Sequence, residues 1–132
     1  MSEPRTPPHG IFCWNELSTN NLEAAKTFYR DLLGWKLHES DAAGMNYIEI
    51  EAAGKRIGGM YQQSPEMGPP MPPHWMAYIA VDNIDAVAAR VAKLGGKVLV
   101  GPMNIPHVGR FAVINDPTGA AISIITLSGH HD

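Results

Sequence analysis

The sequence predicts an α+β fold made of two βαβββ modules in tandem, which form a curved mixed sheet around a cavity. Two observations carry this prediction. Each half of the chain has one helical pattern that follows a strand-like run and precedes three more, and the two halves align as an internal repeat does. With 132 residues, of which 45% are hydrophobic, the chain has the length of one domain that can bury a substantial core.

The first module is predicted over residues 11–62. An aromatic-rich run, Phe12 to Leu17, is expected to form its first strand. Apolar side chains then recur at helical spacing until Gly34, a residue type that commonly ends helices, and residues 19–21 offer side chains suited to the helix N-cap. Three short strand patterns follow, at Trp35–Glu39, Met45–Glu51 and Arg56–Gln62.

A proline-rich segment, residues 63–73, separates the modules. Proline fixes φ and lacks an N–H group, so this segment is predicted to be a semi-stiff linker without a helix. The second module, residues 74–127, starts the pattern again with a strand and a helix expected from Asn83 to Leu94. Three strand patterns follow, at 97–100, 110–115 and 120–126. We therefore expect one domain, residues 1–132, made of two modules and a linker.

The repeat is visible as three aligned fragments. NLEAA at 21–25 matches NIDAV at 83–87, LGWKL at 33–37 matches LGGKV at 94–98, and GKRI at 54–57 matches GAAI at 119–122. Helix caps and glycine stops recur in any pair of βα units. The match over the whole length, however, favours a duplicated module.

Strand alternation sorts the side chains into a helix-covered face and a face toward the predicted hollow. Ala77, Ile79 and Val81 suit the helix side, which leaves Met76 and Tyr78 toward the hollow. The repeat makes Trp14 the counterpart of Met76, and Glu16 shares the face of Trp14. Tyr47 is placed toward the hollow because Ile48 and Ile50 suit the helix side. Ile57 and Ile122 are also assigned to the helix side, and this puts Gly58, Met60 and Ser123 toward the hollow.

Composition excludes several classes of protein. Ten Lys and Arg against 13 Asp and Glu give a net charge of −3, which does not favour nucleic acid. The N-terminal residues lack the apolar stretch of a secretion signal, and no apolar run is long enough to span a bilayer. A single cysteine, Cys13, excludes an internal disulfide and fits a reducing cytoplasm. The common nucleophile, phosphate-loop and metal-helix motifs do not occur.

Three fragments together resemble the vicinal oxygen chelate superfamily, which includes glyoxalase I, bleomycin-resistance proteins and extradiol dioxygenases. They are NLEAAKTFYRDLLGW, AVDNIDAVAARVAKLGGKV and DPTGAAISI, and the likeness covers about residues 11–127. The WNEL-type first strand resembles the glyoxalase-like subgroup. The resemblance implies two βαβββ modules, a ligand in the concave cavity and, commonly, a homodimer.

The resemblance also implies four metal-ligand positions, which fall on Trp14, Gly58, Met76 and Ser123. None is a usual ligand for a hard divalent metal, which prefers imidazole and carboxylate donors. We therefore expect no metal cofactor. An alternative remains open: a two-residue shift in register would bring Glu16 and His74 into the site and restore a divalent metal.

The favoured function is metal-free binding of a small apolar or aromatic molecule, which would contact six side chains: Trp14, Tyr47, Met60, Met76, Tyr78 and Ser123. The alternative is a lyase or isomerase acting on a small carbonyl compound. In that alternative Glu16, desolvated beside Trp14, serves as catalytic base or metal ligand. Glu16 could equally form a structural ion pair with Arg110 or Arg56.

Overall fold

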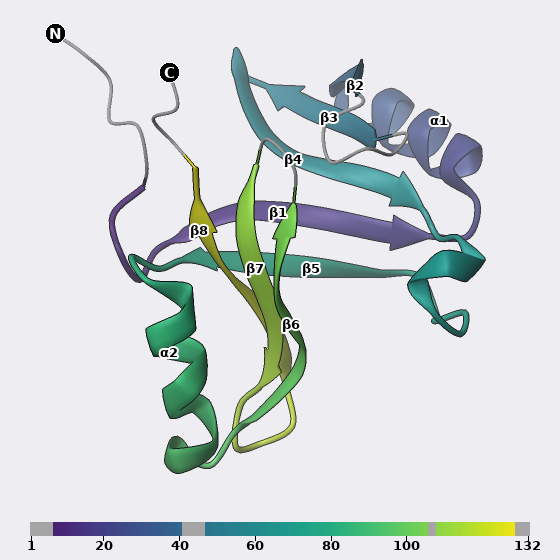
Figure 1. The fold of residues 1–132 in the computed structure, drawn as a ribbon. Coiled ribbons are helices and arrows are strands. Elements are labelled where there is room, and N and C mark those ends of the chain that lie inside the picture. Colours follow the sequence, from purple (N-terminus) through teal and green to yellow (C-terminus); the bar gives the residue numbers. More distant parts are fainter. Residues whose placement is uncertain (1–6, 41–46, 106–107, 129–132) are drawn as a thin grey trace, which may run out of the picture. The chain divides into compact units, whose positions relative to one another are not determined.

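The computed structural model describes residues 7–40, 47–105 and 108–128 (Figure 1). The elements follow the order βαβββ twice. In the first pass they are β1 (Phe12–Thr19), α1 (Leu22–Leu33), β2 (Lys36–Ser40), β3 (Tyr47–Ala52) and β4 (Lys55–Gln62). In the second they are β5 (His74–Ala80), α2 (Ile84–Val91), β6 (Lys97–Ile105), β7 (Gly109–Asn115) and β8 (Ala121–Leu127). The predicted α+β class, with two βαβββ modules that contribute to a mixed sheet, is confirmed, and the sheet is open.

The chain divides into two compact units, which are described separately. The first half is Trp14–Met76, and the second half consists of Ala77 onward together with the residues before Trp14. In the first half the strands lie in the order β2-β3-β4-β1. β1 runs parallel to β4, whereas the β2–β3 and β3–β4 pairs are antiparallel. The sheet of this half is therefore mixed.

Local signals set the ends of α1. The Asn21 side chain accepts a hydrogen bond from the backbone N–H of Ala24 at 3.1 Å, which satisfies one of the free donors at the helix start. Gly34 adopts a left-handed conformation with φ of 72° and ends the helix. The helix packs on a core of Leu17, Leu22, Ile48, Ile50 and Met60. One face of the first sheet is thus covered by α1.

The second half repeats this arrangement with the order β6-β7-β8-β5, and β5 is parallel to β8. Asn83 caps α2 by accepting from the backbone N–H of Ala86 at 3.1 Å. The core of this half contains Val81, Ile84, Ala112 and Ile124, with Val87 of α2 packed against it. Figure 1 shows α2 lying against one face of this sheet, so the helix of this half leaves the opposite face uncovered.

Several element boundaries differ from the predictions by a few residues. The second helix ends as an α-helix at Val91 and continues as a 3-10 turn, Ala92–Leu94. β6 extends to Ile105, beyond the predicted end at Val100. Within the predicted linker, Pro65–Met67 forms a short 3-10 turn, since proline is compatible with the first position of a helix. Two residues of the predicted third strand, Met45 and Asn46, lie outside the described residues.

Candidate functional site

The face of the first sheet that α1 leaves uncovered gathers aromatic and acidic side chains. Backbone pairing sets Glu16 of β1 beside Gly59 of β4, and Gly59 beside Glu49 of β3. Because side chains alternate along each strand, Trp14 shares this face with Glu16, and Tyr47 shares it with Glu49. The predicted placement of Trp14, Glu16 and Tyr47 on the face opposite the helix is correct.

Hydrogen bonds join three of these side chains into one chain. The Trp14 indole donates from Nε1 to Tyr47 Oη at 2.9 Å, and Tyr47 Oη donates to Glu16 Oε2 at 2.8 Å. A tyrosine hydroxyl has a single proton, so accepting from Trp14 leaves that proton for Glu16. The direction of the chain is fixed, and the carboxylate of Glu16 is held beside the indole.

Tyr47 is the central and least accessible member, with 8% of its surface exposed. Burial raises the pKa of the Tyr47 hydroxyl well above its ordinary value, and the negative charge of Glu16 raises it further. Tyr47 therefore stays a neutral donor at physiological pH. Its role is to position the Glu16 carboxylate, and its own hydroxyl does not ionise.

A glycine makes room for this arrangement. A Cβ added at Gly59 would overlap the hydroxyl end of the Tyr47 ring. The ring thus crosses the backbone of β4 at the one residue without a side chain, and reaches from β3 to Glu16 on β1. A glycine inside a strand often marks such a close approach, but the sequence does not show which side chain makes it.

The other charges on this sheet have partners of their own. Arg56 Nη1 lies 3.4 Å from Glu49 Oε1, and His38 Nε2 lies 2.7 Å from Glu51 Oε1. The hydrogen bond with His38 lowers the pKa of Glu51. Among these three carboxylates, Glu16 is the one that accepts a hydrogen bond from the Tyr47 hydroxyl.

The second half has a different uncovered face. Tyr78 of β5 pairs with Ser123 of β8, and Val113 of β7 pairs with Ser123 from the other side. The Tyr78 and Phe111 rings lie with centroids 6.5 Å apart. The placement of Tyr78 and Ser123 on the face opposite the helix is correct. Met76, two residues before Tyr78 on β5 and partly exposed, is the last residue of the first half.

The predicted placement of Met60 toward the hollow is wrong. Met60 has no exposed surface and belongs to the core beneath α1. Alternation then puts Gly58 on the helix side as well, and Ile57 on the uncovered face. Pairing in β1–β4 and β5–β8 makes Gly59, and not Gly58, the counterpart of Ser123. A slip of one residue in the aligned hairpin reversed the faces of β4.

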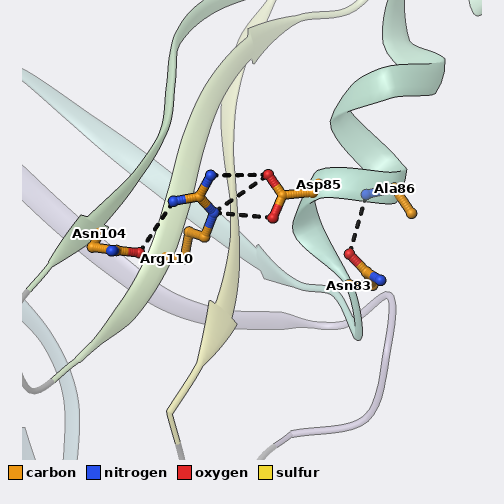
Figure 2. A network of polar contacts seen from close by, with 5 residues as sticks. All are labelled: Asn83, Asp85, Ala86, Asn104 and Arg110. Atoms are coloured by element: carbon orange, nitrogen blue, oxygen red, sulfur yellow. Dashed lines mark hydrogen bonds and ion pairs between the residues drawn. The ribbon is translucent and has the colours of Figure 1, made fainter.

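Arg110 and Arg56, the two alternative ion-pair partners considered for Glu16, each pair with another carboxylate. Arg110 forms a two-pronged bond with Asp85 at the start of α2, with Nε to Oδ2 and Nη2 to Oδ1 both at 3.0 Å (Figure 2). Nη1 of Arg110 also donates to Asn104 Oδ1 at 3.2 Å. The guanidinium lowers the pKa of Asp85. This cluster joins α2 to the neighbouring strands β6 and β7 and has a structural role.

Histidine and cysteine do not assemble a metal site within the described residues. His74 Nδ1 lies 2.9 Å from the carbonyl oxygen of Pro72, and His9 Nδ1 accepts from the backbone N–H of Asp82. Cys13 is partly buried, and burial raises the pKa of its thiol. Across residues 7–40, 47–105 and 108–128, no group of three His, Cys, Asp or Glu side chains could hold a metal ion.

Comparison with known proteins identifies the family. The sequence profile of the Glyoxalase/Bleomycin resistance protein/Dioxygenase superfamily matches residues 12–124. The chain belongs to this superfamily, as the resemblance of the sequence indicated. Among the helices described, none is both long and apolar enough to cross a membrane.

Two curated relatives are longer than this chain. "Putative glyoxylase CFP32" of Mycobacterium bovis is 43% identical over 117 residues, covering 88% of this chain and 44% of that protein. The anthracycline biosynthesis protein DnrV of Streptomyces peucetius is 32% identical over 127 residues, covering 87% of this chain and 46% of that protein. The chain thus spans less than half the length of these relatives.

A solved structure shares the fold. The Mn(II)-bound glyoxalase from Novosphingobium aromaticivorans superposes with a TM-score of 0.60 at 18% identity, covering 89% of this chain and 39% of that chain. Divalent metal is thus present in a structural relative, and the residues of this chain can be tested for a similar role. With the corrected register, the four positions implied by the family are Trp14, Gly59, Met76 and Ser123. Their donor chemistry does not fit a hard divalent metal.

Proposed function

We propose that this chain binds a small, mostly apolar or aromatic molecule without a metal, on the sheet faces that its helices leave uncovered. The observation that carries the proposal is the hydrogen-bonded chain Trp14–Tyr47–Glu16. Its two bonds of 2.9 and 2.8 Å fix an indole and a carboxylate side by side. Such a site offers a flat apolar surface for stacking and one oriented polar group for specificity.

The aromatic side chains on the uncovered faces support the ligand class. Trp14 and Tyr47 in the first half and Tyr78 in the second supply ring surfaces, and the ligand-contact role of Met76 and Ser123 also remains part of the proposal. Met60 is left out because it packs under α1. Indole and phenol rings favour planar apolar partners over small hydrophilic ones.

A second candidate function, a lyase or isomerase step on a small carbonyl compound, is favoured by one feature of the same site. Tyr47 orients the Glu16 carboxylate, as a residue that supports a general base would. In this version Glu16 removes a proton from the carbon next to the substrate carbonyl and returns it at a neighbouring position. Atoms and charge balance without a cofactor.

The first experiment measures binding of 1-acetylnaphthalene by isothermal titration calorimetry. Wild type is expected to bind, and the double variant Trp14→Ala/Tyr78→Ala to bind at least about tenfold more weakly, because it loses ring surface on the uncovered face of each half. Glu16→Gln should keep most of its affinity. Glu39→Gln, an exposed glutamate on β2, is the matched control for the charge change. No binding by wild type would contradict the proposal, and near-stoichiometric Ni, Zn, Fe or Mn in purified protein would contradict its metal-free form.

The two candidates are separated by deuterium exchange. NMR in D2O would follow exchange at the methyl carbon next to the carbonyl of 1-acetylnaphthalene. The binding function predicts no acceleration by the protein. The catalytic function predicts acceleration that Glu16→Gln abolishes and Glu39→Gln leaves unchanged.

We further infer that the chain acts in the cytoplasm as a homodimer. The single cysteine suits a reducing compartment. Membership of the superfamily, whose members commonly form homodimers, supports the dimer. Sedimentation equilibrium at micromolar concentration should give twice the mass of 14.3 kDa, and a monomer would refute the dimer.

A further inference from the structure

The Ser123 hydroxyl is the most unusual polar group of the second half. Ser123 has no exposed surface, and its Oγ has no hydrogen-bond partner among the described residues. Burying a hydroxyl without a partner costs free energy that alanine at the same position would avoid. Most buried side-chain hydroxyls in proteins are hydrogen-bonded, so a group like this calls for a partner beyond the residues that the structure describes.

The surroundings of Ser123 define what that partner could be. Its neighbours in register are Tyr78 and Val113, and the next residue on the same face of β8 is Ile125, which is also buried. The Ser123 hydroxyl is therefore an isolated donor on a largely apolar surface. A molecule that fits this surface is itself apolar and carries few polar atoms.

The aromatic rings indicate a flat molecule. Tyr78 on β5 and Phe111 on β7 come from the strands on either side of β8, and their centroids approach to 6.5 Å. The rings are inclined by 43°, so together they present aromatic surface from two strands against which a planar apolar molecule can pack.

The donor character of Ser123 selects a carbonyl oxygen. If a ligand hydroxyl donated to Oγ, the serine proton would still lack an acceptor. A ligand carbonyl accepts that proton and brings no donor of its own, so both groups are satisfied by one bond.

We propose that the uncovered face of the second half recognises an aromatic ketone or aldehyde, with its rings against Tyr78 and Phe111 and its carbonyl oxygen accepting a hydrogen bond from Ser123. This inference rests on the proposed binding function and names the ligand class. Ser123 is its specificity-determining residue.

The test compares two probes of nearly equal shape, 1-acetylnaphthalene and 1-ethylnaphthalene, by calorimetry with wild type and Ser123→Ala. Wild type is expected to prefer the ketone by about fivefold to tenfold, the size of one hydrogen bond. In Ser123→Ala that preference disappears because ketone binding weakens, while affinity for the hydrocarbon is unchanged.

Thermal unfolding without ligand supplies a second readout. Ser123→Ala is expected to keep or raise Tm, since it removes a buried hydroxyl that has no partner. Thr126→Val is the matched control on the same strand, because Thr126 Oγ1 donates to the carbonyl of Val81 at 2.8 Å. This control should lower Tm and leave the preference for the ketone intact.

The outcomes separate the two proposals. If wild type binds both probes equally and Ser123→Ala changes neither, the ligand class is refuted while the binding function stands. A clear fall in the Tm of Ser123→Ala would also refute the inference, because the hydroxyl would then have a stabilising partner. If wild type binds neither probe, the proposed function itself fails.

Discussion

The two halves of this protein share one topology but treat polar groups on their uncovered faces in opposite ways. Pairing of the parallel strands matches Glu16 and Gly59 in the first half with Tyr78 and Ser123 in the second. In the first half every link of the Trp14–Tyr47–Glu16 chain is made within the half. In the second half the Ser123 hydroxyl has no hydrogen-bond partner among the residues that the structure describes. A duplicated module can thus hold a preorganised polar group in one copy and an unsatisfied one in the other.

A single backbone position accounts for much of the difference. Gly59 lets the Tyr47 ring cross β4, whereas its counterpart Ser123 has a side chain there. The counterpart of Tyr47, by the same pairing, is Phe111, which has no hydroxyl to complete a chain. The polar chemistry of each half therefore follows from which residue occupies the middle of its last strand.

The largest expected effect tests the corrected assignment of the β4 faces, in which Met60 lies in the core. Met60 and Ile124 are equivalent core residues by strand pairing, at 0% and 4% exposure. Met60→Ala and Ile124→Ala should each lower the free energy of unfolding by about 2–5 kcal/mol, because each leaves a cavity. Urea denaturation measures this. Met60→Leu, which conserves volume, should cost less than about 1.5 kcal/mol and leave ligand binding unchanged.

A loss below about 1 kcal/mol for Met60→Ala would mean that Met60 does not lie in the core. The two modules would then align through Gly58, and the comparison between the halves would have to be drawn again.

The next effect concerns the Tyr47 ring, which crosses the backbone of β4 at Gly59. Gly59→Ala places a methyl group where the Tyr47 ring lies, so it should cost about 1–3 kcal/mol of unfolding free energy through overpacking. In a Tyr47→Ala background the same substitution should cost much less, because the ring is gone. A double-mutant cycle of urea denaturation curves measures the coupling. Additive effects would show that Gly59 does not serve to admit the ring.

A smaller effect isolates the hydrogen bonds from the packing. Tyr47→Phe keeps the ring but removes the acceptor for Trp14 and the donor for Glu16, at an expected cost of about 1–2 kcal/mol. Phe111→Tyr is the reciprocal change in the second half. It should not raise the free energy of unfolding by a matching amount, because the described residues there offer no pair of partners like Trp14 and Glu16. A change within about 0.5 kcal/mol for Tyr47→Phe would argue against a preorganised Glu16.

The sequence predicts the helices well because their signals are local. Asn21 and Asn83 cap through side chains only three residues from their donors, and Gly34 ends α1 by its own backbone conformation. The faces of β1 and β3 were also predictable, because Leu17, Ile48 and Ile50 alternate cleanly with polar or aromatic neighbours.

The faces of β4 could not be predicted from such an alternation. Its centre is Gly58–Gly59, which gives no side-chain pattern, and its apolar residues Ile57 and Met60 have opposite parity, so only one can face α1. The structure selects Met60 because it completes the core with Ile48 and Ile50. The Trp14–Tyr47–Glu16 chain was out of reach for a related reason, since it joins residues more than 30 positions apart through the space that Gly59 leaves.

The smallest expected effect compares the last hairpin turn of each half. The turn between β3 and β4 consists of Ala53 and Gly54, both with positive φ, and has no titrating group. The turn between β7 and β8 is organised by Asp116, whose Oδ1 accepts from the Thr118 hydroxyl at 2.6 Å and from two backbone N–H groups. The Thr118 hydroxyl, followed by these N–H groups, lowers the pKa of Asp116 below its ordinary value of 3.8.

A carboxylate whose pKa is lowered on folding stabilises the turn at pH values above its unfolded pKa, and this contribution is lost as pH falls through the lower folded pKa. Protection of the Ala120 amide against hydrogen exchange should therefore be constant from pH 7 down to about 4 and fall below that value, after correction for intrinsic exchange. The effect is small because Asp116 is exposed. Asp116→Ala should lose this protection at neutral pH and show no acid step, while the Lys55 amide beside the β3–β4 turn shows none in either protein. An acid step of equal size at both turns would mean that it reports global unfolding, and the contrast between the two hairpins would not hold.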